Sequence, residues 1–95
     1  MNKDASISEL CNWICERESK SIADSKGVIT EDGKIFIELL EKNPSKILDA
    51  IKRTNQSKIR LFIMETNQSV FVADYDKLCE DVFEGLKKRF TPLSS

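Results

Sequence analysis

The strongest constraint on this chain is an apolar stripe close to its C-terminal end. Seven apolar side chains recur there at the three- and four-residue spacing of one helix face: Tyr75, Leu78, Cys79, Val82, Phe83, Leu86 and Phe90. Acidic residues occupy the first half of this segment and basic residues its last turn, which matches the helix dipole. The pattern predicts a helix from about Asp74 to Phe90 that ends before Pro92.

A second helical pattern extends from about Ser6 to Ala23. Its apolar face is formed by Ile7, Leu10, Cys11, Ile14 and Ile22. Ser6 followed three residues later by Glu9 is typical of a capping box at a helix start. Trp13, the only tryptophan, points away from the centre of this face. It is therefore either a contact for a partner or a second packing contact within a helix that is buried on two sides.

The segment after the first helix is expected to form a hairpin. Val28–Thr30 and Lys34–Leu40 are interpreted as strands, because Asp32 and Gly33 between them favour a tight turn. A helix over Phe36–Lys42 is the alternative.

Asn43 followed by Pro44 predicts the start of a further helix, which we expect to end near Arg53. The tetrapeptide Thr-Asn-Gln-Ser occurs at 54–57 and again at 66–69. We interpret both copies as polar connections on either side of a strand at 58–65, with a last strand at 70–73 completing a second hairpin.

The element order is then α-β-β-α-β-β-α. It predicts one α+β domain over residues 1–95, with a four-stranded, mostly antiparallel sheet and three helices, and with 1–5 and 92–95 as frayed ends. Apolar residues lie on both faces of the strands at 34–40 and 58–65. Helices on one side of the sheet would leave Phe36 and Phe62 in need of other cover: the first helix, a partner, or a second copy of the chain.

Several function classes are disfavoured by composition. The chain has no histidine, which removes the commonest general base and the commonest metal ligand. Cys11 and Cys79 are interpreted as small core residues, and Cys15 lies at the border of the apolar stripe. The three glycines do not form a phosphate-binding motif. We therefore expect a protein that is not an enzyme and that has no cofactor and no metal site.

The compartment is predicted from what the sequence lacks. There is no apolar run of the roughly 20 residues that a membrane span needs, and the start has no apolar signal-peptide stretch. Three cysteines form no disulfide framework. These features predict a cytoplasmic protein without a membrane partner.

A neutral total charge conceals a basic middle segment. The net charge is −1, but residues 42–60 hold six basic groups against one acidic group. We expect a module that masks or regulates a larger protein, as an inhibitor, immunity protein, adaptor or chaperone does. The expected contact residues are Trp13, Phe36, Arg53, Lys58, Arg60 and Phe62. The alternative is a nucleic-acid-binding regulator that uses 42–60, although the acidic flanks make nucleic acid the less favoured partner; homodimerisation is left open.

Overall fold

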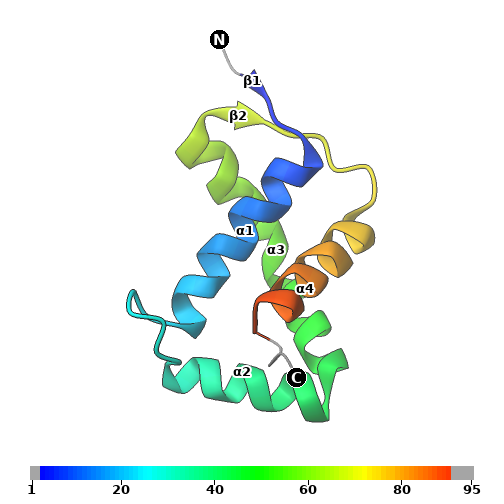
Figure 1. Ribbon diagram of the computed structural model, residues 1–95. Coiled ribbons are helices and arrows are strands. Elements are labelled where there is room, and N and C mark those ends of the chain that lie inside the picture. The colour runs from blue at the N-terminus through cyan, green and yellow to red at the C-terminus, as the bar shows by residue number, and fades with distance from the viewer. Residues whose placement is uncertain (1–2, 91–95) are drawn as a thin grey trace.

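The computed structural model describes residues 3–90, and this part of the chain is built mainly from helices (Figure 1). The helices are α1 (Ile7–Ile22), α2 (Glu31–Lys42), α3 (Pro44–Thr66) and α4 (Tyr75–Phe90). Two short strands, β1 (Lys3–Asp4) and β2 (Gln68–Ser69), pair in parallel. Within the described residues no helix is both long and apolar enough to cross a membrane.

The predicted α+β fold with a four-stranded antiparallel sheet is therefore wrong. In the described part of the chain the only strand pairing longer than a single bridge is the two-residue parallel contact between β1 and β2. The edges and the second face of this sheet are the reasons to consider homodimerisation, and both reasons are lost with the sheet. The two terminal helices are confirmed: α1 and α4 lie within one residue of their predicted bounds, and Ser6 Oγ accepts a hydrogen bond from the Glu9 amide at 3.0 Å.

The predicted first hairpin is instead the start of α2. The Thr30 hydroxyl accepts a hydrogen bond from the Gly33 amide at 2.9 Å, which makes Thr30 the N-cap of the helix. A Cβ at position 33 would lie 2.0 Å from the Ile22 carbonyl oxygen, so glycine allows this turn to approach the end of α1. The helical alternative for Phe36–Lys42 is therefore correct. A short run of adjacent apolar residues fits the period of a strand and that of a helix equally well, so the sequence alone does not distinguish them.

The predicted second hairpin belongs mostly to α3. Asn43 and Pro44 begin this helix as expected, but it continues for 23 residues and includes both the predicted connection at 54–57 and the predicted strand at 58–65. Asn55 is 2% exposed, and its side-chain amide donates to Cys79 Sγ at 3.6 Å. The second copy of the tetrapeptide does end a helix, because Asn67 takes a left-handed conformation with φ 54°.

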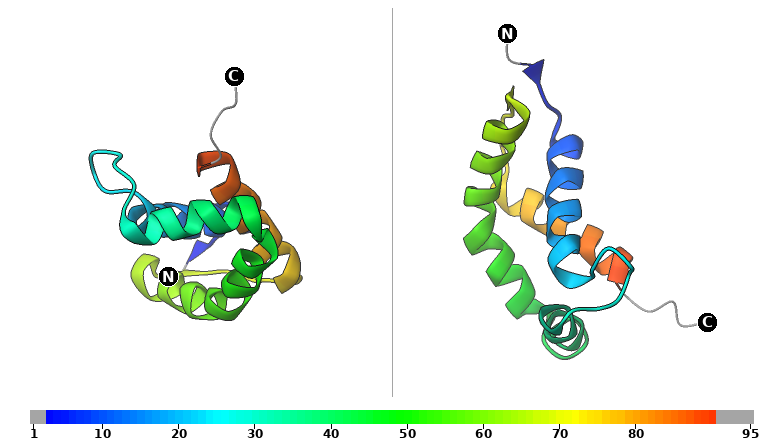
Figure 2. Two further views of the ribbon diagram at one scale, coloured as in Figure 1. Left: turned by 90° about the horizontal axis from the view of Figure 1, so that it is seen from below. Right: turned by 90° about the vertical axis from the view of Figure 1, so that its left-hand side faces the viewer.

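α4 packs against both α1 and α3, and α2 lies across one end of the molecule (Figure 2). The buried apolar side chains of the core come from α1, α3 and α4: Leu10, Ile14, Cys15, Ile22, Ile47, Ile51, Phe62, Leu78, Cys79, Val82 and Leu86. In α2, Phe36, Leu39 and Leu40 pack against this core but stay partly exposed. α2 is therefore a peripheral helix, with space left between it and α3.

Candidate functional site

Two of the predicted contact residues pack against each other inside the molecule. The rings of Trp13 and Phe62 meet edge to face with centroids 5.6 Å apart, which joins α1 to α3. The guanidinium carbon of Arg17 lies 5.1 Å from the Trp13 ring centroid. Phe62 is only 2% exposed and Trp13 is partly buried. The structure thus places Trp13 in the intramolecular contact that was the alternative to a partner contact.

Phe36 occupies a different region. Its ring meets Phe90 edge to face at a centroid distance of 6.0 Å, which joins α2 to α4. It remains partly exposed and also lines a pocket described below.

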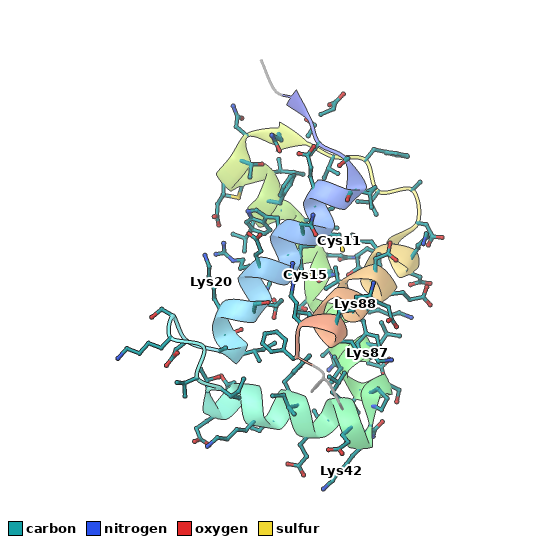
Figure 3. All side chains as sticks on the ribbon, in the orientation of Figure 1. Cys11, Cys15, Lys20, Lys42, Lys87 and Lys88 are labelled. Atoms are coloured by element: carbon teal, nitrogen blue, oxygen red, sulfur yellow. The ribbon has the colours of Figure 1, made fainter. Side chains whose placement is uncertain are left out.

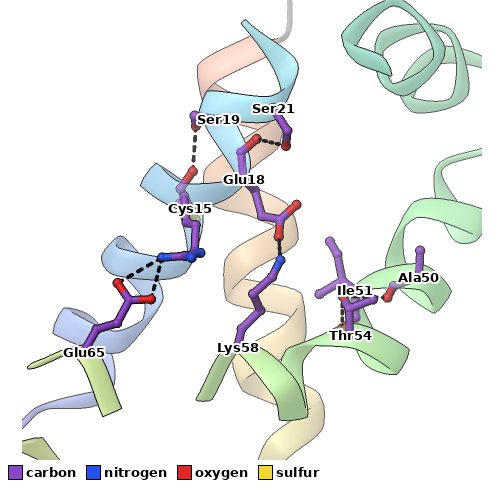
Figure 4. Close-up of polar contacts among 10 residues, drawn as sticks. Cys15, Glu18, Ser19, Ser21, Ala50, Ile51, Thr54, Lys58 and Glu65 are labelled. Carbon is purple, nitrogen blue, oxygen red and sulfur yellow. Dashed lines mark hydrogen bonds and ion pairs between the residues drawn. The ribbon is translucent and has the colours of Figure 1, made fainter. Parts of the chain in front are cut away.

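The structure separates the basic residues of 42–60 into paired and unpaired groups. Lys58 forms a partly buried ion pair with Glu18 of α1 (Figure 4). Lys52 lies 3.9 Å from Asp76 of α4, and Lys42 pairs with Glu38 of its own helix at 3.1 Å. The predicted group Arg53, Lys58 and Arg60 is therefore divided, since Lys58 connects two helices inside the molecule.

The unpaired cations lie on one side of α3. Seven residues separate Lys46 from Arg53, and seven more separate Arg53 from Arg60. Neighbouring cations are therefore nearly two helical turns, or about 10.5 Å, apart along the helix axis. All three are exposed, and none has an ion pair within residues 3–90. Asp49 lies beside Lys46 and Arg53 on the helix and has no ion pair within the described part of the chain.

Small or flexible side chains lie between these cations. Ala50, Ser57 and Met64 occupy the alternate positions of the same row, and Met64 is 77% exposed. We call the row Lys46, Ala50, Arg53, Ser57, Arg60 and Met64 the α3 stripe. The seven-residue repeat places the three cations on one side only if residues 44–66 form one helix. A connection at 54–57, as expected from the sequence, would break this alignment.

A pocket of about 270 Å³ lies between α2 and α3. Its apolar walls are formed by Ile35, Phe36, Leu39, Ile47, Ala50, Ile51 and Leu86. Polar side chains also line it, namely Glu18, Lys46, Thr54, Asn55 and Lys58. Sequence reasoning missed this α2–α3 pocket because a strand at 34–40 would place Phe36 on the face opposite to Ile35 and Leu39, whereas the helix brings all three to the pocket.

Cys11 and Cys15 lie one turn apart on α1 (Figure 3), and their thiols interact. A hydrogen bond from the Cys15 thiol lowers the pKa of Cys11 to about 7, with help from Arg89 and against the effects of burial and of Asp81. The pKa of Cys15 is raised, first because its proton is held by Cys11 and then because it is buried. The Cys15 thiol also donates a 3.5 Å hydrogen bond to the Val82 carbonyl oxygen, so its single proton is shared between that oxygen and Cys11. The first proton that the pair loses is therefore assigned to Cys11.

This assignment predicts how the thiols react. Because the thiolate is the nucleophile, alkylation of Cys11 by iodoacetamide is expected to increase with pH through a midpoint near 7. Cys15→Ala removes the donor and should move that midpoint up towards the ordinary thiol range of about 8.5. Cys79→Ala is the control and should not move it. Mass spectrometry of peptides alkylated at a series of pH values gives the midpoints; equal midpoints for the wild type and Cys15→Ala would contradict the assignment.

Within residues 3–90 no group of three or more His, Cys, Asp or Glu side chains could hold a metal ion. Comparison of the chain with protein-family models, with curated proteins and with solved structures gives no match.

Proposed function

We propose that this chain is a non-enzymatic protein-binding module that masks or regulates a larger protein, and that the α3 stripe is its contact surface. The observation that carries the proposal is the separation of the basic side chains. Lys52 and Lys58 are paired with carboxylates of α4 and α1, whereas Lys46, Arg53 and Arg60 face solvent in one row without a partner among the described residues.

The chemistry of the stripe favours an acidic helix as the partner. Three cations over 14 residues of helix extend about 21 Å. A partner helix that lies along α3 would match them with carboxylates at the same seven-residue repeat. Ala50 and Ser57 are small, so they allow the two helices to approach closely between the charged contacts. Met64 would supply an adaptable apolar contact at the end of the row.

The alternative partner, nucleic acid, has less support. Phosphates could also bind the cations of the stripe. Stacking of bases needs exposed aromatic rings, however, and Phe62, one of the two rings next to the basic segment, is 2% exposed. Phe71, the other ring, is 82% exposed but lies outside the stripe.

The test uses the tagged chain to capture its partner protein from a nuclease-treated lysate of the source cell. The captured complex is then cross-linked with a carbodiimide. Carbodiimide joins an amine directly to a carboxylate, so it reports an acidic partner at Lys46. We expect a protein that cross-links through Lys46 to its own Asp or Glu side chains. Lys46→Glu, Arg53→Glu and Arg60→Glu together should weaken its binding by at least about tenfold, because three attractive contacts become repulsive.

The matched control reverses three other exposed lysines, Lys20, Lys87 and Lys88, which lie on α1 and α4 (Figure 3). It changes the net charge by the same amount and should leave binding within about twofold. Equal losses in the two triple variants would contradict a role for the stripe. Material that is lost on nuclease treatment would instead favour the nucleic-acid alternative.

The cytoplasmic location remains a prediction of the sequence, and homodimerisation remains open. The expected roles of Trp13, Phe36 and Phe62 as contacts are not part of this proposal, because these side chains pack within the molecule.

A further inference from the structure

The α2–α3 pocket offers a second binding site, which shares Lys46 and Ala50 with the α3 stripe but differs from it in shape. The stripe is a row on the outside of one helix, whereas the pocket is a concavity with walls from all four helices: Ile35 and Leu39 of α2, Ile51 of α3, Glu18 of α1 and Leu86 of α4. Apolar side chains form most of its surface. Such a concavity with a few polar groups is typical of sites for small organic molecules.

The size of the pocket limits what it can hold. An apolar protein cavity of about 150 Å³ is large enough for benzene. At about 270 Å³ this pocket has nearly twice that volume. The part of a ligand that fills it is therefore about the size of an aliphatic chain of eight to ten carbons or a bicyclic aromatic ring.

The charged groups of the pocket favour an anionic end on that molecule. Glu18 and Lys58 form an ion pair with each other, so their charges largely cancel. Lys46 is exposed, lines the pocket and has no ion pair within the described residues. A carboxylate that reached Lys46 while its apolar part filled the space beside Ile51 and Leu86 would satisfy both features of the site.

We propose that the α2–α3 pocket binds a small amphipathic monoanion, an aliphatic or aromatic carboxylate of about eight to ten carbons. This proposal goes beyond the proposed function and does not depend on it. Arg53 and Arg60 do not line the pocket. Reversing the charge of these two residues therefore disrupts the stripe and leaves the pocket unchanged.

The test uses octanoate and 1-octanol as probes of the ¹⁵N-labelled full chain. We expect saturable amide shifts at Ile35, Leu39, Ala50 and Thr54 on addition of octanoate, and several-fold weaker binding of 1-octanol, which lacks the negative charge. Ala50→Leu fills the pocket from its own wall and should weaken octanoate binding by more than about tenfold. Retained melting temperature in this variant separates pocket filling from loss of the fold.

The charged end is tested separately. Lys46→Gln should bring the dissociation constant of octanoate close to that of 1-octanol, whereas Lys26→Gln, a control in an exposed loop, should not. The Arg53→Glu and Arg60→Glu variant should bind octanoate like the wild type. Shifts outside the pocket, undiminished binding to Ala50→Leu, or equal affinity of the wild type for the two probes would each overturn the proposal.

Discussion

Phe62→Ala is expected to lower the free energy of unfolding by about 3–5 kcal/mol, the usual cost of truncating a buried aromatic side chain. Phe62 is 2% exposed, belongs to the core and packs edge to face on Trp13. Its loss would leave a cavity between α1 and α3 and remove an aromatic contact that adds to the buried area. For a chain of 95 residues this is a large part of the total stability.

Phe71→Ala is the matched control, because the same side chain is removed from a position that is 82% exposed. We expect a change within about 0.5 kcal/mol for this variant. Urea unfolding followed by circular dichroism measures both. Comparable losses in the two variants would contradict the packing of Phe62 between α1 and α3.

Gln56→Pro is expected to have an effect of similar size, about 3 kcal/mol or more, or to prevent folding. Position 56 is exposed and lies in the middle of α3, so the cost comes from the backbone and not from lost packing. Proline removes a helical hydrogen bond and its ring collides with the preceding turn. In a connecting loop at 54–57 the same change would cost far less.

Gln56→Ala, the control for this substitution, keeps the helix and should be neutral or slightly stabilising, since alanine has the highest helix propensity. Thermal unfolding of the two variants distinguishes the alternatives. A Gln56→Pro variant that melts within a few degrees of the wild type would show that α3 is interrupted there.

The parts of the fold that were predicted correctly have one unambiguous period. The stripe from Tyr75 to Phe90 repeats only as a helix, and the Ser6 and Glu9 pair fixes the start of α1. The run from Ile35 to Leu40 is apolar at nearly every position, so strand and helix fit it equally well. Two features decide for a helix in that case. The cap at Thr30 is a local contact with the Gly33 amide, whereas the close approach of Gly33 to the Ile22 carbonyl is a tertiary feature that the sequence does not show.

The error at 54–57 has a different cause. Thr54 and Asn55 are polar and are common in turns. In the structure the Thr54 hydroxyl donates to the Ala50 carbonyl at 3.0 Å, and the Asn55 amide is buried against Cys79. Because both side chains have hydrogen-bond acceptors within the chain, they are compatible with a continuous helix. No pattern in the sequence indicates that Cys79 would lie beside Asn55.

The candidate site was predictable only in part. Arg53 and Arg60 were expected contacts and are exposed on the stripe. Lys58 was expected beside them, but its pairing with Glu18 depends on how α1 crosses α3. Lys46 lies in the basic segment 42–60, but its alignment with Arg53 and Arg60 cannot be predicted without the full length of α3.

The central claim is that residues 44–66 form one uninterrupted helix, since the stripe exists only on that helix. Backbone ¹³Cα chemical shifts of the labelled protein test it directly. The structure predicts helical, downfield deviations at every residue from 46 to 64, including 54–57. Random-coil values at 54–57 followed by upfield, strand-type deviations over 58–65 would contradict the helix and, with it, the α3 stripe.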